Sequence, residues 1–502
     1  MEENLFNKFL EQSNSIADIN SATAILGWDQ ETYMPDGAVD IRAEQTATLS
    51  KLVHRLTVDE NYGNMIDELS NGKGAELEPW QKNVVVQTKK DRDKASKFPE
   101  EFIHEAAKVM SHGNEDWKKA RRASDFSLFQ NSLEKIVDIK RREADYIGFK
   151  DNPYDALLNE FEEGMTVTQL KPIFERLRIA TIKLLEKVKN STIKPTDNII
   201  HAGFDTKKQI EFSESIIKKL GFDFNFGRID LTTHPFCTSF GMTDVRLTTR
   251  VYENDLRSCL FGLIHESGHG MYEQGFDKRY ARTSVASGTS MGIHESQSLF
   301  WENMVSRSSE FWEWAFPILQ NKFPEKLNDI NSNEFYKAIN VIAPSDIRVE
   351  SDELTYNLHI ILRFEIEEGL INNTIQVKDI PEIWNSKTKE YLGFVPENDA
   401  KGCLQDIHWS FGGIGYFPSY TLGKLYAAMW FDKLKSEIPN IKDQFSKGEF
   451  TETLDWLRKN IHQYGRSKSP SQLCIDICGK PLNEENFIAH IERKIDKVYY
   501  NS

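Results

Sequence analysis

The feature that most constrains this chain is the pentapeptide HESGH at residues 265–269. On an α-helix, His265 and His269 stand four residues apart on one face, so both imidazoles can reach a single zinc ion. The apolar neighbours Leu260, Leu263, Ile264 and Met271 predict that this helix is largely buried. Because burying polar groups without partners is costly, the fold must supply a partner for both rings, and a zinc ion meets that need. The alternative is a hydrogen-bonded pair of core histidines.

Two carboxylates extend this pattern. Glu266 stands beside the histidines, where it is placed to take a proton from a metal-bound water rather than to bind the metal. A catalytic zinc needs a third protein ligand, and Gly275 stands six residues past His269, where a further histidine would extend the motif. The candidate is Glu295, in the stretch GIHESQ at residues 292–297. Its neighbour His294 points about 100° away on a helix and cannot also face the metal.

Helical periodicity dominates the rest of the sequence. Apolar stripes at helical spacing include Leu5, Phe6, Phe9 and Leu10, then Phe102, Ala106 and Val109, then Leu133, Ile136 and Ile139. The spacing predicts a helix over 351–369, in which Ser351 is the cap, Leu354, Leu358, Ile361 and Leu362 form the buried stripe, and Gly369 ends the helix. Since no repeat, charge block or linker interrupts the chain, we expect residues 1–502 to form a single unit.

One region departs from the helical pattern. Residues 244–251 read DVRLTTRV, which alternates polar and apolar side chains as a strand with two unlike faces does. Short β-like runs broken by Gly and Pro precede it at 222–243, and they predict a small antiparallel sheet beside the HESGH helix. The expected fold class is therefore mainly α with one small sheet.

Composition excludes several partners. The net charge of −15 repels phosphate backbones and anionic lipids, so we expect neither nucleic acid nor a membrane as a partner. The N-terminal residues lack the basic and apolar regions of a signal peptide, and no apolar run approaches about 18 residues. Five cysteines in so long a chain favour a reducing compartment, so the expected location is cytoplasmic.

Six ordered motifs and one segment near the start carry a family resemblance. HPF stands at 234–236, DVRLT at 244–248, HESGH at 265–269, HESQ at 294–297, IRVESD at 347–352 and GCLQDIHW at 402–409, and ILGWDQETYMP at 25–35 belongs to the same set. In this order and spacing the chain resembles the M32 metallocarboxypeptidases, the carboxypeptidase Taq type. The one less usual residue is Ser351, which stands where the family more often has Ala.

The resemblance implies a large helical body with a deep substrate cleft. It implies removal of single amino acids from peptides with a free C-terminus. One zinc ion per chain is expected, or cobalt in some members, together with a homodimer. His265, His269 and Glu295 would be the metal ligands and Glu266 the catalytic base. The alternatives are a zinc endopeptidase or dipeptidyl carboxypeptidase on a similar helical fold, or a scaffold with a vestigial site; the intact Glu266 argues against the scaffold.

Two charged motif residues have functional interpretations beside structural ones. Asp244 lies on a strand face, where its carboxylate could accept the second ring N–H of a zinc-bound histidine. The structural alternative is a surface ion pair. Arg348 precedes the helix predicted at 351–369, and a guanidinium there suits a substrate carboxylate. Its structural alternative is an ion pair with Asp352 or Glu350.

An uncharged, aromatic and Gly-rich stretch at 409–423 suits the lining of a substrate pocket. His408 and Tyr420 are the polar donors at this stretch, where either could stabilise a developing oxyanion or hold the peptide. His234, in the HPF motif, is a similar candidate. For each of the three, a buried and satisfied hydrogen bonder is the alternative.

Overall fold

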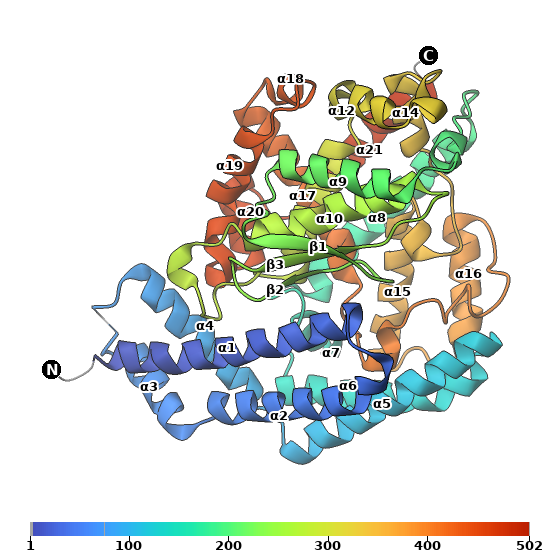
Figure 1. Ribbon diagram of the computed structural model, residues 1–502. Coiled ribbons are helices and arrows are strands. Elements are labelled where there is room, and N and C mark those ends of the chain that lie inside the picture. The colour runs from blue at the N-terminus through green and yellow to red at the C-terminus, as the bar shows by residue number, and fades with distance from the viewer. Residues whose placement is uncertain (1–3, 75, 501–502) are drawn as a thin grey trace.

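The computed structural model describes residues 4–74 and 76–500 and is mostly helical (Figure 1). The helices of the first half are α1 Leu5–Thr32, α2 Val39–Thr57, α3 Glu60–Ser70, α4 Pro79–Ala95, α5 Glu100–Ala123, α6 Ser127–Ile147, α7 Pro153–Leu158, α8 Val167–Lys189 and α9 Thr206–Leu220. Those of the second half are α10 Leu256–Glu273, α11 Met291–Leu299, α12 Ser309–Lys322, α13 Pro324–Leu327, α14 Ser332–Ile339, α15 Tyr356–Ile371, α16 Ile380–Leu392, α17 Pro418–Glu437, α18 Ile441–Phe445, α19 Thr451–Asn460, α20 Pro470–Cys478 and α21 Glu485–Ile495.

A small sheet lies against α10, as predicted (Figure 1). Its strands, β1 Gly227–Leu231, β2 Cys237–Ser239 and β3 Val245–Thr249, stand in the order β1-β3-β2. Leu247 pairs with Cys237 in an antiparallel register and with Ile229 in a parallel one, so the prediction of an antiparallel sheet is wrong and the sheet is mixed. The reason is the connection between β1 and β2, which carries the chain to the far edge of β3.

The helix predicted over 351–369 is present but displaced. Asp352, not Ser351, accepts hydrogen bonds from the backbone amides of Leu354 and Thr355, both at 2.9 Å, and α15 begins at Tyr356. The predicted apolar stripe is buried. Gly369 does not end the helix, which continues to Ile371. Its lack of a side chain instead makes room for Ile375, which a Cβ atom at 369 would approach to 2.5 Å.

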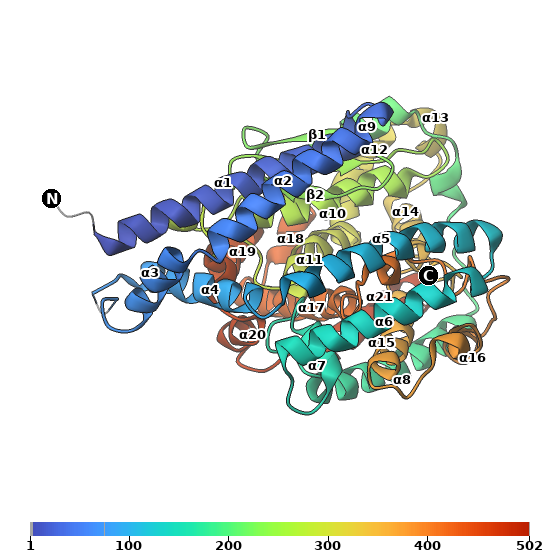
Figure 2. The ribbon, with the colours of Figure 1, turned by 90° about the horizontal axis from the view of Figure 1, so that it is seen from below.

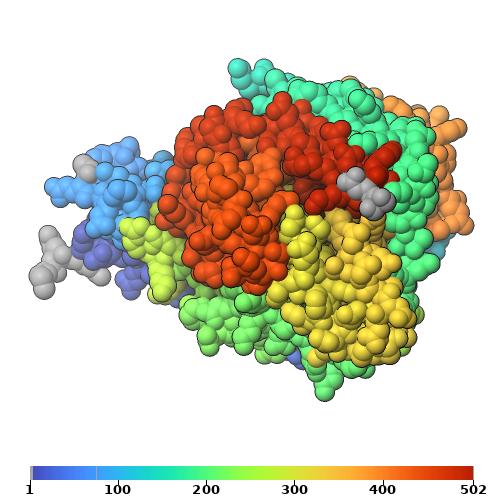
Figure 3. All heavy atoms as spheres, turned by 90° about the horizontal axis from the view of Figure 1, so that it is seen from above, coloured from blue at the N-terminus to red at the C-terminus, as the bar shows by residue number. Residues whose placement is uncertain are grey.

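The long helices form pairs around the centre of the molecule. Seen from below in Figure 2, the α1–α2 pair and the α5–α6 pair lie in front of α10, α11 and α17, which agrees with their place at the bottom of Figure 1. From above, Figure 3 shows the C-terminal helices side by side with the segment around residues 310–340. A large apolar core joins most of the helices, and a smaller cluster that includes Phe6, Phe9, Tyr62 and Val285 holds α1, α3 and α4 together. No helix within the described ranges is both long and apolar enough to cross a membrane.

Helices α10 and α11 approach each other closely at Gly268, in the middle of the HESGH pentapeptide. A Cβ atom at this position would lie 2.6 Å from the carbonyl oxygen of Gln297 and 2.6 Å from Cα of Ser298, both on α11. A backbone atom cannot move away as a flexible side chain can. Glycine at 268 therefore permits the helix contact on which the position of α11 depends.

We expect Gly268→Ala to lower the free energy of unfolding by about 1–3 kcal/mol, because the added methyl group overpacks a backbone contact. Urea unfolding of the metal-free protein measures the change. The matched control is Gly262→Ala on the same helix, where a Cβ atom would meet only Thr249 Oγ1 at 3.9 Å. That variant should gain up to about 1 kcal/mol, since Ala is the better helix former. Equal stability of the two variants would contradict the role given to Gly268.

Candidate active site

Three predicted ligand side chains meet between α10 and α11. His265 and His269 project from α10, and Glu295 projects from α11, which Ser290 caps by accepting a hydrogen bond from Ile293 N at 3.0 Å. The Nε2 atoms of His265 and His269 lie 3.7 and 3.5 Å from Glu295 Oε2. All three candidate ligand atoms lie within 4.8 Å of one another.

A second glycine brings Glu295 into position. At Gly423 on α17, a Cβ atom would lie 2.6 Å from Glu295 Cγ. Helix α17 therefore packs directly on the side chain of Glu295 and limits where it can point. Because any side chain at position 423 would collide with Glu295, Gly423 leaves the space that the Glu295 side chain occupies. The position of Glu295 therefore depends on both α10 and α17.

The other nitrogen of each ring is already engaged. His265 Nδ1 donates to Glu302 Oε2 at 2.9 Å, and His269 Nδ1 donates to the carbonyl oxygen of His294 at 3.1 Å. These bonds orient the rings so that Nε2 faces Glu295. Two imidazole nitrogens and a carboxylate oxygen form a donor set that suits zinc, so the residues present fit the metal that the family resemblance implies.

Glu302 was not predicted from the sequence. It lies in a π-helical turn, η4 Phe300–Ser306, that follows α11 directly. Burial raises its pKa, but the hydrogen bond from His265 and the charge of Arg307 prevail and bring the pKa of Glu302 down to about 2. Its position seven residues after Glu295, two helical turns on the same face, was the available signal.

The prediction for Asp244 is wrong. Its carboxylate accepts two hydrogen bonds from Arg246, each at 2.9 Å, and its side chain is 42% exposed. Asp244 lies in the turn before β3, where the surface ion pair is formed, and Glu302 takes the role beside His265. The surface-pair alternative therefore describes Asp244.

His294 directly precedes Glu295 on α11 and points in a different direction, as expected. Its ring contacts His269 and Glu273 instead. Its ring stacks on that of His269 with centroids 4.5 Å apart, and its Nδ1 lies 2.7 Å from His269 Nδ1. Its Nε2 donates to Glu273 Oε1 at 2.9 Å. His294 and Glu273 therefore support His269 from the side opposite Glu295.

Glu266 is buried beside this cluster. Within the described residues its carboxylate takes part in no hydrogen bond or ion pair, so both oxygens are available to a reactant. Burial raises the pKa of Glu266 to about 7, with a contribution from the nearby carboxylates of Glu295 and Glu302 that the charge of His265 opposes. A carboxyl group poised near neutral pH suits a general base.

A second group of predicted residues meets at the end of α15. Arg348, in the short 3-10 helix η5 Arg348–Glu350, is 5% exposed and donates to Asp406 Oδ1 from Nε at 3.0 Å and Nη2 at 2.7 Å. Its guanidinium lies 4.9 Å from the ring centroid of Tyr420, and His408 Nε2 lies 3.3 Å from Tyr420 Oη. The structure thus brings together Arg348, His408 and Tyr420. The ion-pair partner is Asp406 rather than Asp352 or Glu350.

His234 does not join this group. It is exposed in the segment between β1 and β2, and within the described residues it contacts neither Arg348 nor His408 nor Tyr420 through a hydrogen bond, ion pair or ring contact. Its role in holding substrate stays a prediction.

The Arg348 group carries a surplus of positive charge. Asp406 is shared by two buried arginines, since Arg363 Nε donates to its Oδ2 at 2.7 Å. Burial lowers the pKa of His408 to about 4 and that of His359 to about 3, so both rings are neutral near pH 7. Two guanidinium groups therefore face one carboxylate, an imbalance that favours a bound anion. Neither Arg363 nor Asp406 was predicted as a site residue, although Asp406 lies in the GCLQDIHW motif.

Tyr356 relates the Arg348 group to the candidate metal ligands. The ring of Tyr356 packs near Tyr420 at 6.1 Å, and its hydroxyl accepts a hydrogen bond from Arg348. Burial raises the pKa of Tyr356 to about 12, and the carboxylate of Glu295 adds to this effect against the charge of Arg348. Tyr356 therefore contacts the buried arginine directly and is within electrostatic reach of the candidate metal ligand Glu295.

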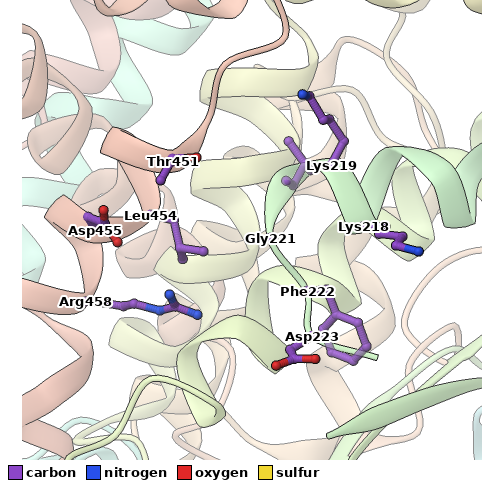
Figure 4. A pocket seen from close by; sticks show the side chains of 10 residues that line it. Lys218, Lys219, Gly221, Phe222, Asp223, Thr451, Leu454, Asp455 and Arg458 are labelled. Atoms are coloured by element: carbon purple, nitrogen blue, oxygen red, sulfur yellow. The ribbon is translucent and has the colours of Figure 1, made fainter. Parts of the chain in front are cut away.

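A surface hollow of about 400 Å³ lies elsewhere, between the end of α9 and α19 (Figure 4). Its walls include Lys218, Lys219, Asp223 and Arg458, and it contains no predicted site residue. This hollow is not the deep substrate cleft that the family resemblance implies, and the cleft stays a prediction.

Known proteins resemble the chain over almost its entire length. The model of the family described as carboxypeptidase Taq (M32) metallopeptidase matches residues 8–495. The chain is 39% identical to carboxypeptidase 1 of Bacillus subtilis, with 98% of each protein covered, and 35% identical to thermostable carboxypeptidase 1 of Thermus thermophilus, with 99% of each covered. The crystal structure of an M32 carboxypeptidase from Deinococcus radiodurans is 36% identical and superposes with a TM-score of 0.97, covering 99% of this chain and 100% of the other. The chain therefore belongs to the carboxypeptidase Taq (M32) family of metallopeptidases.

Proposed function

We propose that this protein is a zinc-dependent carboxypeptidase that releases single amino acids from peptides with a free C-terminus. The observation that carries the proposal is the convergence of His265, His269 and Glu295, with their ligand atoms within 4.8 Å, beside the unpaired carboxylate of Glu266. Relatives in Bacillus subtilis and Thermus thermophilus are named carboxypeptidases, which supports the same reaction class here.

In this proposal His265, His269 and Glu295 hold one zinc ion per chain, with cobalt as the alternative metal. Such an ion would supply Lewis-acid polarisation of the scissile carbonyl and would acidify water. Glu266 takes a proton from the attacking water on its carboxylate and later delivers it to the leaving amine. Glu302 and His294 keep the two rings in the tautomer and orientation that leave Nε2 free.

Specificity for a terminal carboxylate requires a cation inside an acidic protein. Arg348 is the proposed contact, and Arg363 maintains the surplus of positive charge by sharing Asp406. His408 and Tyr420 are proposed to donate hydrogen bonds to the last residue of the peptide. His234 is proposed to contact the peptide from the exposed segment between β1 and β2.

The remaining features of the proposal rest on the sequence and the family. A homodimer and a single unit over residues 1–502 are proposed from the resemblance and from the absence of a linker. A cytoplasmic location is proposed because all five cysteines are free in the structure.

We predict that Glu302→Gln weakens zinc affinity about 10- to 100-fold, because His265 loses its charged acceptor. Competition with a chromophoric chelator measures the dissociation constant. The matched control is Asp244→Asn, which removes a carboxylate that contacts Arg246 instead and should leave zinc affinity unchanged. A weaker affinity in the control alone would reverse the two assignments.

Glu266→Gln should keep its metal and lose about 10²–10⁴-fold in kcat, since the amide cannot accept the proton. Elemental analysis and steady-state kinetics on the same sample separate the two effects. Ser267→Ala, a change at the next residue whose hydroxyl donates to Ile264 O on the same helix, should stay within a few-fold of the unmodified enzyme. Loss of the metal from Glu266→Gln would show that this carboxylate is a ligand.

Arg348→Ala should lower kcat/KM at least about tenfold for peptides with a free C-terminus, because a charge-assisted contact contributes roughly 1.5–3 kcal/mol. C-terminally amidated peptides, already poor substrates, should change little. Arg246→Ala is the control, since this arginine pairs with Asp244. If the unmodified enzyme cleaved amidated and free peptides equally, both the role of Arg348 and the exopeptidase assignment would fail.

A further inference from the structure

The carboxylate of Glu367 on α15 is fully buried and accepts three hydrogen bonds. Oε1 accepts from Trp409 Nε1 at 2.8 Å, and Oε2 accepts from Gly415 N at 3.0 Å and from the hydroxyl of Tyr154 at 2.7 Å. Two of these donors, Trp409 and Gly415, are the ends of one loop, which we call the 409–415 loop. A single carboxylate therefore ties both ends of this loop to α15.

The 409–415 loop is a tight, glycine-dependent turn. Gly415 has a φ angle of +97°, and a Cβ atom there would lie 2.8 Å from the backbone of Leu157 on α7. Gly413 N donates to His408 O at 2.8 Å, which closes the turn on itself. Inside the loop Gly412 N donates to Trp409 O at 3.1 Å, and Asn114 on α5 donates to Ser410 Oγ at 3.1 Å. The middle of the loop is thus a compact turn, and Glu367 holds its two ends.

The two proposed peptide donors lie on either side of the loop. His408 directly precedes Trp409, and Tyr420 lies in the first turn of α17, which Tyr416 and Phe417 join to Gly415. The ring of His408 lies 5.3 Å from that of Tyr416 and 6.2 Å from that of Tyr420. The 409–415 loop joins His408 to the segment that carries Tyr416 and Tyr420. The span of this loop, which Glu367 holds, therefore helps to set the distance between His408 and the two tyrosines.

Helix α15 anchors the whole segment with two successive turns. Arg363 binds Asp406, and Glu367, four residues later on the same face, binds Trp409 and Gly415. Asp406 in turn binds Arg348. The positions of Arg348 and His408 thus both derive from polar contacts with one face of α15.

Both oxygens of Glu367 are occupied, so this carboxylate cannot also contact a reactant. Burial raises its pKa to about 7, and its three donors act in the opposite direction. A buried carboxylate that serves only packing could be replaced by an apolar side chain at lower cost. Its contacts instead meet at the loop that carries the proposed substrate donors.

We propose that Glu367 is a positioning residue that fixes the 409–415 loop, and through it the spacing of His408 and Tyr420 around the last residue of the peptide. The inference rests on the proposed carboxypeptidase function. It predicts a change in substrate binding rather than in the chemical step, because Glu367 contacts neither the candidate metal ligands nor Glu266 in the described chain.

The test compares three variants of the full-length, metal-loaded protein on one peptide with a free C-terminus. Glu367→Gln places an amide N–H against a donor of the loop and should raise KM about tenfold, with kcat within about threefold of the unmodified enzyme. Trp409→Phe keeps the ring, removes one loop bond and should raise KM in the same direction. Tyr154→Phe, the matched control, removes the bond to Glu367 that comes from α7 and should leave KM within about twofold.

The double variant Glu367→Gln with Trp409→Phe should raise KM by less than the product of the two single effects, because both changes act on the contacts of one carboxylate. An unchanged KM in folded Glu367→Gln would overturn the proposal. So would an equal rise in KM for Tyr154→Phe and Trp409→Phe, since a general loss of stability would then explain both. If Glu367→Gln does not fold, the comparison of Trp409→Phe with Tyr154→Phe decides, and an unchanged KM in Trp409→Phe contradicts the proposal.

A readout independent of activity separates this inference from the proposed function. Hydrogen exchange of the Gly415 amide should be at least about tenfold faster in Glu367→Gln than in the unmodified protein and unchanged in Tyr154→Phe. If the unmodified protein releases no amino acids from peptides, the proposed function fails, and the exchange of Gly415 still reports whether Glu367 holds the loop. Equal exchange in all variants would show that Glu367 does not hold it.

Discussion

The active site depends on one contact, that of the Glu295 carboxylate with the imidazoles of His265 and His269. This contact joins α10 to α11, two separate segments of the chain. It forms only because α10, α11 and α17 approach one another closely. Gly268 permits the first approach and Gly423 the second. The remaining partners follow from this arrangement, since Glu302 follows α11 directly and accepts from His265 Nδ1, which leaves Nε2 facing Glu295.

Buried charge organises the rest of the site. In a protein with a net charge of −15, a peptide carboxylate gains nothing from the overall field and needs a local cation. In the proposed function the pair Arg348 and Arg363 provides it, with Asp406 neutralising only part of the charge. Helix α15 holds both Asp406 and the 409–415 loop, so the proposed carboxylate contact and the proposed peptide donors share one scaffold. Tyr356 binds Arg348 on this scaffold and also senses the charge of Glu295.

Local patterns in the sequence predicted the parts of the fold and site that local geometry determines. The spacing of His265 and His269 placed both on one helix face, and the alternation at 244–251 located β3 to within two residues at its far end. What depended on long-range packing was not predictable in this way. The parallel pairing of β1 with β3 requires knowing that the chain crosses to the other edge of β3.

The errors at the site have the same origin. Asp244 precedes His265 by 21 residues and Glu302 follows it by 37, and it is the fold, with Glu302 in the π-helical turn after α11, that brings Glu302 to His265. The contacts of Arg348 with Asp406 and of Glu367 with Trp409 join residues more than forty positions apart. Resemblance to a family identified the motif that contains Asp406, but it did not reveal this pairing.

The most direct test of the central claim is mass spectrometry of one unblocked peptide during digestion, with and without a metal chelator. The account predicts a ladder of products, each shorter than the last by one residue from the C-terminus, that disappears in chelator and returns when zinc is added. Release of dipeptides or internal fragments would contradict the proposed carboxypeptidase. A ladder that is unaffected by the chelator would contradict the role of His265, His269 and Glu295.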